Sequence, residues 1–128
     1  MGDTWSYLRA HISNGRTDLD FSRTAAIEAD YQVYKRSLAA IGWTPSEYVR
    51  QVHLQGASSC LIRNGFPYDF PGNISHYVLF AGKPLLKRTV SLIIRQNFPG
   101  RETLWFVNTP DLQSIKDLWH CHIFVKDS

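Results

Sequence analysis

The sequence predicts an α+β domain with a largely antiparallel sheet, and three observations support this prediction. Apolar residues recur with helical spacing in the first half of the chain. From residue 58 onward, short runs rich in β-branched and aromatic residues replace that spacing. Gly and Pro separate these runs, as they commonly do between strands. The predicted order is helix-helix-β-β-α-β-β in a single domain of 128 residues, mostly helical over 1–57 and sheet-forming over 58–128.

The first predicted helix follows a stripe of apolar residues at spacings of three and four. The stripe consists of Ile27, Tyr31, Tyr34, Leu38 and Ile41. Gly42 then occupies the position typical of a helix C-cap. Residues 1–23 are mixed and polar, and we expect them to wrap the surface.

The second predicted helix has the clearest start signal in the chain. Thr44 can cap it, Pro45 fits its first position and Glu47 completes a capping box. The helix should run to about residue 55 and stop at Gly56. Its expected inward-facing residues are Tyr48, Val49 and Val52.

The second half of the chain predicts four strands and one further helix. Strands are expected over residues 58–63, 75–81, 102–108 and 118–125, with a loop over 64–73. The segment 84–97 fits both a helical stripe and a strand alternation. Its length, and Pro84 at its start, favour a helix.

Composition excludes several classes of protein. Hydrophobic residues make up 44% and charged residues 20%, which excludes a disordered chain, a coiled coil and a collagen-like repeat. The net charge of +3 is scattered, which indicates an ordinary solvated surface; nucleic acid is not an expected partner, whereas a pocket for a small anion is compatible. No apolar run approaches the roughly 18 residues of a membrane span.

Two cysteines, Cys60 and Cys121, lie inside apolar runs. Free cysteine is commonly buried, so we expect two unpaired, largely buried thiols in a reducing compartment. The first residues lack the basic and apolar regions of a secretory signal. The expected location is therefore intracellular, cytoplasmic or nuclear.

Histidines on predicted strands are the main candidates for chemistry. His120 and His122 are two residues apart, so they should share one face of a strand over 118–126, with Phe124 continuing that face. We expect this strand to lie beside the strand over 102–108. His76 lies on another predicted strand.

Three interpretations of these histidines remain open. In the first, His120 and His122 are two partly exposed residues on a polar sheet face. They could instead bind a metal, with His76 as a third ligand to the pair His120 and His122, although structural zinc sites usually contain cysteine. In the third interpretation a neutral imidazole attacks phosphorus and forms a covalent intermediate, helped by a group that fixes its tautomer and by donors to the phosphate oxygens.

The order of motifs over about residues 58–126 resembles the histidine triad superfamily. The matching residues are Cys60-Leu-Ile-Arg-Asn64-Gly-Phe66-Pro67-Tyr68, Gly72, His76-Tyr-Val-Leu-Phe80, Asn108, Gln113-Ser114 and His120-x-His122. The resemblance implies an antiparallel sheet with helices packed on one face, here with two added N-terminal helices. It also implies that His122 is the nucleophile and His120 the flanking histidine. Phe124 departs from the third position, where the superfamily has His or Gln, and residues 115–119 form an insertion.

A more specific resemblance is to a family of uncharacterised domains known from fungal N-acetylglucosamine-induced proteins. It is carried by Asn64-Gly-Phe66-Pro67-Tyr68-Asp69, Ile74-Ser-His76-Tyr, Trp105-Phe106-Val107-Asn108-Thr-Pro, Leu112-Gln-Ser114-Ile115 and His120-Cys-His122-Ile-Phe-Val125. The name of that family records induction by a sugar and implies no activity.

The expected function is binding of a phosphorylated small molecule, a nucleotide or nucleotide sugar, with hydrolysis or transfer at phosphate through His122. The alternatives are a non-catalytic ligand-binding or protein-interaction domain, and a metal-dependent hydrolase that uses the three histidines. No cofactor is expected, and the oligomeric state is left open. The N-terminus of the segment 84–97 would add donors for phosphate. The expected ligand-binding residues are Asn64, His76, Lys83, Asn108, Gln113 and Ser114.

Overall fold

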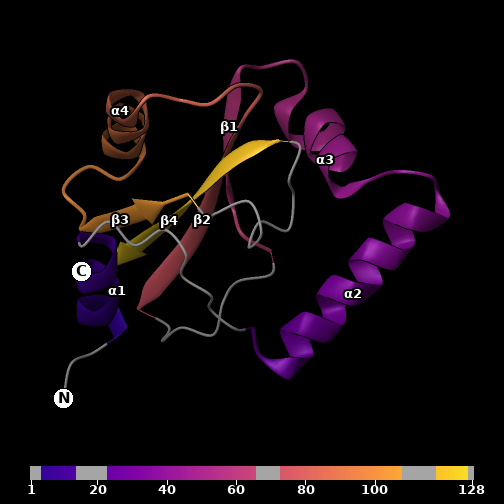
Figure 1. Ribbon diagram of the computed structural model, residues 1–128, viewed down its shortest axis with the longest axis horizontal. Coiled ribbons are helices and arrows are strands. Elements are labelled where there is room, and N and C mark those ends of the chain that lie inside the picture. Colours follow the sequence, from indigo (N-terminus) through magenta and orange to yellow (C-terminus); the bar gives the residue numbers. More distant parts are fainter. Residues whose placement is uncertain (1–3, 14–22, 66–72, 108–117, 127–128) are drawn as a thin grey trace.

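The computed structural model describes residues 4–13, 23–65, 73–107 and 118–126 (Figure 1). Four helical elements precede the first strand: α1 (Thr4–Ser13), α2 (Ala25–Ala40), α3 (Pro45–Tyr48) and the π-helical turn η1 (Val49–Leu54). Then follow β1 (Ser59–Arg63), β2 (Ile74–Ala81), α4 (Lys87–Asn97), β3 (Thr103–Phe106) and β4 (Trp119–Lys126). The predicted α+β class and the helical state of the segment 84–97 are therefore confirmed.

The four strands form one antiparallel sheet in the order β1-β2-β4-β3. β4 lies between β2 and β3, so its residues have neighbours on both sides. The predicted pairing of the His-x-His strand with the strand before it is confirmed, because Phe106 of β3 lies opposite His122. The sheet is therefore largely built around β4, the strand with the paired histidines.

One face of the sheet is packed against α4 and is entirely apolar in its core. Side chains of β2 and β4 on this face meet Val90 and Ile94 of α4. Because side chains alternate along a strand, Cys121, Ile123 and Val125 of β4 all point to this side. We refer to it as the apolar face; its buried members are Leu79, Val90, Ile94, Cys121, Ile123 and Val125.

The opposite face, which we call the histidine face, carries His76, His120 and His122. α1 covers one part of it, through a cluster of Trp5, Leu8, Ile74, Phe106 and Phe124. η1 covers another part, through a cluster of Val49, Leu54, Val78, Phe80 and Leu118. Figure 1 shows α4 and α1 on opposite sides of the sheet. The expectation of helices on one face is therefore wrong, since helices cover both.

The helix α1 was not predicted. Two helices were expected before the sheet, whereas α1, α2, α3 and the π-helical turn η1 precede it. Trp5 and Leu8 are buried at a spacing of three, a signal that the polar residues around them obscure. The indole Nε1 of Trp5 donates to Glu102 Oε2 at 3.1 Å, and Arg9 forms an ion pair with the same carboxylate. These contacts fix α1 beside β3.

The capping box predicted at Thr44 is confirmed. Thr44 Oγ1 accepts from the backbone N–H of Glu47 at 3.2 Å, and Glu47 Oε1 accepts from the backbone N–H of Thr44. Beyond Tyr48 the helix widens to π geometry, so that Val49 and Leu54, five residues apart, are both buried. This widening explains why Val52, predicted to face inward from a period of 3.6, is exposed.

Two further expectations need correction in detail. Ile41, expected on the inward face of the α2 helix, is 64% exposed because the helix has already ended at Ala40. Cys60 and Cys121 are both free, as predicted, but only Cys121 is fully buried whereas Cys60 is half-buried. Within the described part of the chain, none of the helices has the length and apolar character needed to cross a membrane.

Candidate functional site

The candidate site is built on β4 and its neighbour β2. Ladder pairing places His122 opposite Val78, His120 opposite Phe80 and His76 opposite Phe124. Opposed residues in a sheet share a face, so the three imidazoles lie side by side on the histidine face. His120 and His122 are 4% and 8% exposed, which overturns the interpretation of two partly exposed surface histidines.

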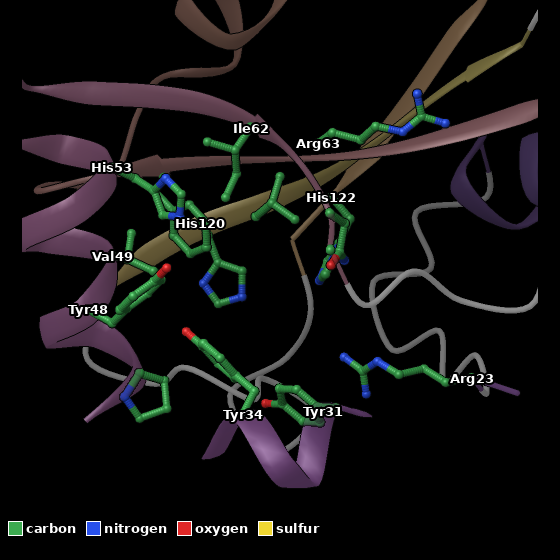
Figure 2. A pocket seen from close by; sticks show the side chains of 15 residues that line it. Arg23, Tyr31, Tyr34, Tyr48, Val49, His53, Ile62, Arg63, His120 and His122 are labelled. Atoms are coloured by element: carbon green, nitrogen blue, oxygen red, sulfur yellow. The ribbon is translucent and has the colours of Figure 1, made fainter. Parts of the chain in front are cut away.

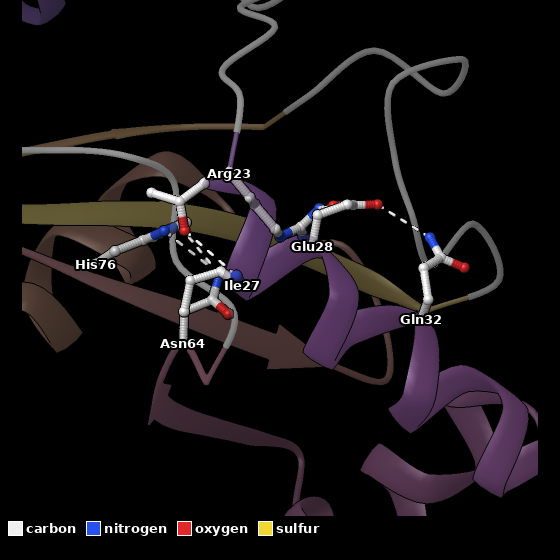
Figure 3. A network of polar contacts seen from close by, with 7 residues as sticks. Arg23, Ile27, Glu28, Gln32, Asn64 and His76 are labelled. Atoms are coloured by element: carbon white, nitrogen blue, oxygen red, sulfur yellow. Dashed lines mark hydrogen bonds and ion pairs between the residues drawn. The ribbon is translucent and has the colours of Figure 1, made fainter.

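Asn64, His76 and His122 form a connected polar chain. His76 Nε2 lies 2.8 Å from His122 Nδ1. Asn64 Nδ2 lies 3.3 Å from His76 Nδ1 and 3.5 Å from His76 Nε2 (Figure 3). Asn64 directly follows β1, and its backbone N–H donates to the carbonyl of His76 at 2.9 Å. The extended β1–β2 pairing therefore positions the amide of Asn64 beside the imidazole of His76.

The direction of the hydrogen bonds between Asn64, His76 and His122 determines which ring nitrogens carry protons. With the amide of Asn64 donating to Nδ1 of His76, the proton of His76 is on Nε2 and is donated to Nδ1 of His122. The proton of His122 is then on Nε2. If the amide is turned so that its oxygen accepts, every bond reverses and Nε2 of His122 carries a lone pair. The orientation of Asn64 thus selects between a donor and a nucleophile at His122.

Burial keeps the three imidazoles neutral. Desolvation lowers the pKa of His76 to about 3, with a smaller contribution from the charge of Arg23. Desolvation lowers the pKa of His122 well below its usual value, assisted by His76, His120 and Arg23. Burial also lowers the pKa of His120, although its Nδ1 donates to the carbonyl of Leu118 at 3.0 Å. This bond leaves the lone pair of the neutral His120 ring on Nε2.

A cavity of about 330 Å³ opens between the histidine face and the helices α2 and α3 (Figure 2). The sheet contributes His120 and His122, together with apolar side chains of β1 and β2. The helices contribute three tyrosines and His53. We call this space the histidine cavity; its lining is Arg23, Tyr31, Tyr34, Pro45, Tyr48, Val49, His53, Ile62, Arg63, Asn64, Gly65, Val78, Phe80, His120 and His122.

Arg23 is the most notable charged group at the cavity. Its side chain is 19% exposed and lies just before α2, close enough to the histidines to influence the pKa values of His76 and His122. The guanidinium lies 4.4 Å from the ring centroid of Tyr31 and 3.5 Å from the carboxylate of Glu28. Stacking and ion pairing together hold a positive charge near neutral imidazoles.

The structure brings together some of the predicted site residues. Asn64, His120 and His122 line the histidine cavity, and His76 lies behind them, in contact with Asn64 and His122. Lys83 is exposed and is not in the cavity lining, because it precedes α4, which packs on the apolar face. The α4 N-terminus therefore does not add donors to this cavity. Asn108, Gln113 and Ser114 lie outside the described residues.

Phe124, the departure at the third triad position, does not line the histidine cavity. It is fully buried in the cluster under α1, with its ring centroid 4.9 Å from that of His76 and 5.7 Å from that of Phe106. The side chain therefore serves packing between the sheet and α1. Its place in the cluster also supports His76 from the side away from the cavity.

The helical side of the cavity was missed from the sequence. In the sequence, Arg23 belongs to a polar segment expected to wrap the surface, and His53 carries no signal of its own. Tyr31, Tyr34 and Tyr48 were recognised as inward-facing, but an aromatic stripe at helical spacing is usually core. Only their convergence on the cavity in three dimensions separates these residues from ordinary core tyrosines.

A metal centre receives no support from the described residues. Among them, no group of three or more His, Cys, Asp or Glu side chains is arranged to hold an ion. His76 Nε2 and His122 Nδ1 face each other at hydrogen-bond distance, so these two atoms are committed to each other rather than to a shared ion.

Comparison with known proteins places this α+β chain near a family of uncharacterised domains. Residues 82–126 match the family described as "Protein of unknown function (DUF3605)". The chain is 24% identical over 126 residues to "Uncharacterized protein YPL067C" of Saccharomyces cerevisiae (strain ATCC 204508 / S288c). That match covers 80% of this chain and 62% of the yeast protein, so the chain spans less than two thirds of the relative.

The fold is also similar to a solved structure described as "Crystal Structure of HTC1". The TM-score is 0.60 at 20% identity, and the match covers 99% of this chain and 86% of that chain. At this identity the likeness concerns the fold alone.

Proposed function

We propose that this domain binds a phosphorylated small molecule, a nucleotide or nucleotide sugar, in the histidine cavity. The observation that carries the proposal is Arg23, a largely buried guanidinium that lines the cavity together with neutral imidazoles. A cation held in a low-dielectric site attracts an anion more strongly than an exposed one does. Guanidinium groups also match phosphate oxygens with paired hydrogen bonds.

The histidines supply the remaining donors and acceptors for such a ligand. With the amide of Asn64 donating, Nε2–H of His122 is a donor suited to a phosphate oxygen. Nε2 of His120 carries a lone pair suited to a ligand hydroxyl, because its Nδ1–H is held by Leu118. These groups favour an anion that also carries hydroxyl groups.

The resemblance to the histidine triad superfamily supports the same class of ligand. Four of the residues that carry it, Asn64, His76, His120 and His122, converge beside the cavity. The proposal includes a fold like that of the histidine triad superfamily. The resemblance to fungal N-acetylglucosamine-induced proteins adds no activity to it.

A second candidate function is hydrolysis at phosphate through His122, favoured by its 2.8 Å contact with His76. The Nε2 lone pair of His122 would bond to phosphorus while the bond from phosphorus to the leaving oxygen breaks. That oxygen keeps the electron pair and takes a proton from solvent. Water then cleaves the P–N bond, leaving its hydroxyl on phosphorus and its proton in solvent. This route requires the reversed proton chain, with the oxygen of Asn64 accepting.

Two features favour binding without turnover over this second candidate. Phe124 has neither donor nor acceptor and packs under α1, so it does not assist a leaving group. Turnover also requires one particular orientation of the Asn64 amide, with its oxygen accepting, whereas binding of an anion at Arg23 does not depend on that orientation. We therefore place ligand binding first.

Calorimetric titration with adenosine 5′-monophosphate (AMP) and a uridine diphosphate sugar tests the binding proposal. Arg23→Gln should weaken binding of either ligand at least tenfold, because it removes the charge at the cavity. Arg88→Gln, at an exposed residue of α4, is the matched control and should bind like the unmodified protein. Absence of binding by the unmodified protein, or equal affinity in the two variants, would overturn the proposal.

Turnover is tested separately by product analysis and intact mass. His122→Ala should abolish any hydrolysis, whereas His122→Asn should spare binding because an amide retains a donor. A phosphate or nucleotidyl adduct on the unmodified protein that His122→Ala lacks would establish the second candidate. If the ligand binds but neither an adduct nor a product forms, the protein binds the ligand without turnover and the second candidate is rejected.

A further inference from the structure

The histidine cavity has two ends of different chemistry (Figure 2). Arg23 and His122 lie at one end, and Tyr48, Val49 and His53 lie at the other, with His120 between them. The sheet forms an apolar floor from Ile62, Val78 and Phe80. A ligand that fills the cavity therefore needs an anionic end and an apolar end.

The apolar end is formed mainly by aromatic rings set at right angles. Tyr34 and Tyr48 meet edge to face at 5.5 Å and 82°, and Tyr48 meets His53 at 5.6 Å and 80°. Such an arrangement presents both ring faces and ring edges, which suits a flat aromatic ligand. The π-helical geometry of η1 places His53 and Val49 on the same wall.

The tyrosine hydroxyls add polar contacts to this wall. Figure 2 shows the hydroxyl tips of Tyr34 and Tyr48 directed into the cavity. Burial raises the pKa of Tyr34 to about 12, with smaller contributions from Tyr48 and Tyr31. The phenol of Tyr34 is thus a proton donor throughout the physiological pH range, able to meet a ring nitrogen or carbonyl at the edge of a ligand.

We propose that Tyr34 and Tyr48 form a ring-binding subsite, so that the cavity selects a phosphate joined to a flat heteroaromatic ring over a plain sugar phosphate. This inference rests on the proposed function and names its specificity-determining residues. The volume of about 330 Å³ lies at the small end of the range of ligand pockets, roughly 300–1,000 Å³. It fits a nucleoside monophosphate better than the larger nucleotide sugar.

The subsite comes from elements that the histidine motifs do not include. Tyr34 belongs to α2 and Tyr48 to α3, both before the first strand. The edge-to-face contact of Tyr34 with Tyr48 connects the two helices at this point. The N-terminal helices therefore contribute ligand selectivity, whereas the sheet contributes the phosphate end.

Titration of the full chain with AMP, ribose 5-phosphate and a uridine diphosphate sugar tests the subsite. AMP should bind at least tenfold more tightly than ribose 5-phosphate, because stacking on aromatic side chains contributes that much per base. Tyr48→Leu should remove most of this preference and leave the affinity for ribose 5-phosphate within twofold. Tyr7→Leu, at a half-exposed tyrosine of α1, is the control and should keep the preference.

The outcomes separate the subsite from the underlying function. Equal affinity for AMP and ribose 5-phosphate, or an AMP preference that survives Tyr48→Leu, overturns the subsite while phosphate binding stands. Binding of none of the three overturns both. Tyr34→Phe keeps the ring and the packing; a three- to tenfold loss of AMP affinity in this variant supports the hydroxyl contact even if Tyr48→Leu fails to fold. Full AMP affinity in Tyr34→Phe contradicts that contact.

Discussion

The two faces of the sheet are both buried but differ in the side chains that they bury. On β4, Cys121, Ile123 and Val125 point to the apolar face and are at most 1% exposed. His120 and His122 point to the opposite face and are at most 8% exposed. Successive residues of β4 from His120 to Ile123 therefore place an imidazole on one face and an apolar side chain on the other.

This difference shows that the histidine face is not optimised for packing alone. An aliphatic side chain buried at His122 would stabilise the fold without the desolvation of a polar ring. The imidazole must instead be satisfied by partners, and His76 and Asn64 contribute to this. Such a polar cluster beside a cavity is more typical of a binding site than of a core. Burial of apolar side chains on the apolar face offsets the free energy of desolvating the imidazoles on the histidine face.

The largest expected effect is on stability in acid. The folded-state pKa of His76 is lowered to about 3, so above pH 6.5 the ring is neutral in both the folded and the unfolded chain and takes nothing from the stability. As pH falls from 6.5 towards 3, the unfolded chain binds a proton that the folded chain does not. His76 alone should then cost about 5 kcal/mol of unfolding free energy. His120 and His122 act in the same direction.

Urea denaturation from pH 8 to 4 measures the part of this loss that falls above pH 4, about 3 kcal/mol for His76. The unmodified protein should be acid-labile below pH 6.5, and His76→Gln should have a shallower dependence of stability on pH. An unchanged slope in His76→Gln would contradict the assignment of a buried neutral imidazole.

The next largest effect is expected from the apolar face. Ile123 is fully buried, so Ile123→Ala should cost about 3 kcal/mol through lost burial and a residual cavity. Because the residue does not titrate, its loss should be the same at every pH between 5 and 8. A pH-dependent loss would mean that the two faces are not energetically separate.

A smaller loss of stability is expected at the start of α3, which carries part of the cavity wall. Thr44→Ala removes the cap at the start of α3 and should cost about 1 kcal/mol. The change should appear as a lower urea midpoint with an unchanged slope, whereas Thr44→Ser, which retains the hydroxyl, should keep most of the stability. An unchanged midpoint in Thr44→Ala would show that the cap does not contribute.

Local signals in the sequence predicted most of the fold. The capping box at Thr44 and the alternation around His120 depend only on neighbouring residues, and both were correct. The helix α1 was missed because its buried residues, Trp5 and Leu8, are too few to stand out among polar neighbours. The coverage of both faces by helices was also missed, since it depends on long-range packing that no local pattern encodes.

The site was predicted less completely than the fold. His120 and His122 were found because a polar pair on an apolar strand is unusual. Arg23 and Tyr34 were not assigned to the site, because a single arginine in a polar segment and a tyrosine on a helix have ordinary structural explanations. Their role depends on which helix approaches which face of the sheet.

The most direct test of the account compares two neighbours on β4 that point to opposite faces. We predict that His122→Phe lowers the affinity for AMP at least tenfold, whereas Ile123→Ala binds AMP within twofold of the unmodified protein despite its lower stability. The measurement is calorimetric titration at pH 7.5 and low temperature, where both variants should remain folded. Equal affinities in the two variants, or a loss confined to Ile123→Ala, would contradict the division of the sheet into a binding face and a packing face.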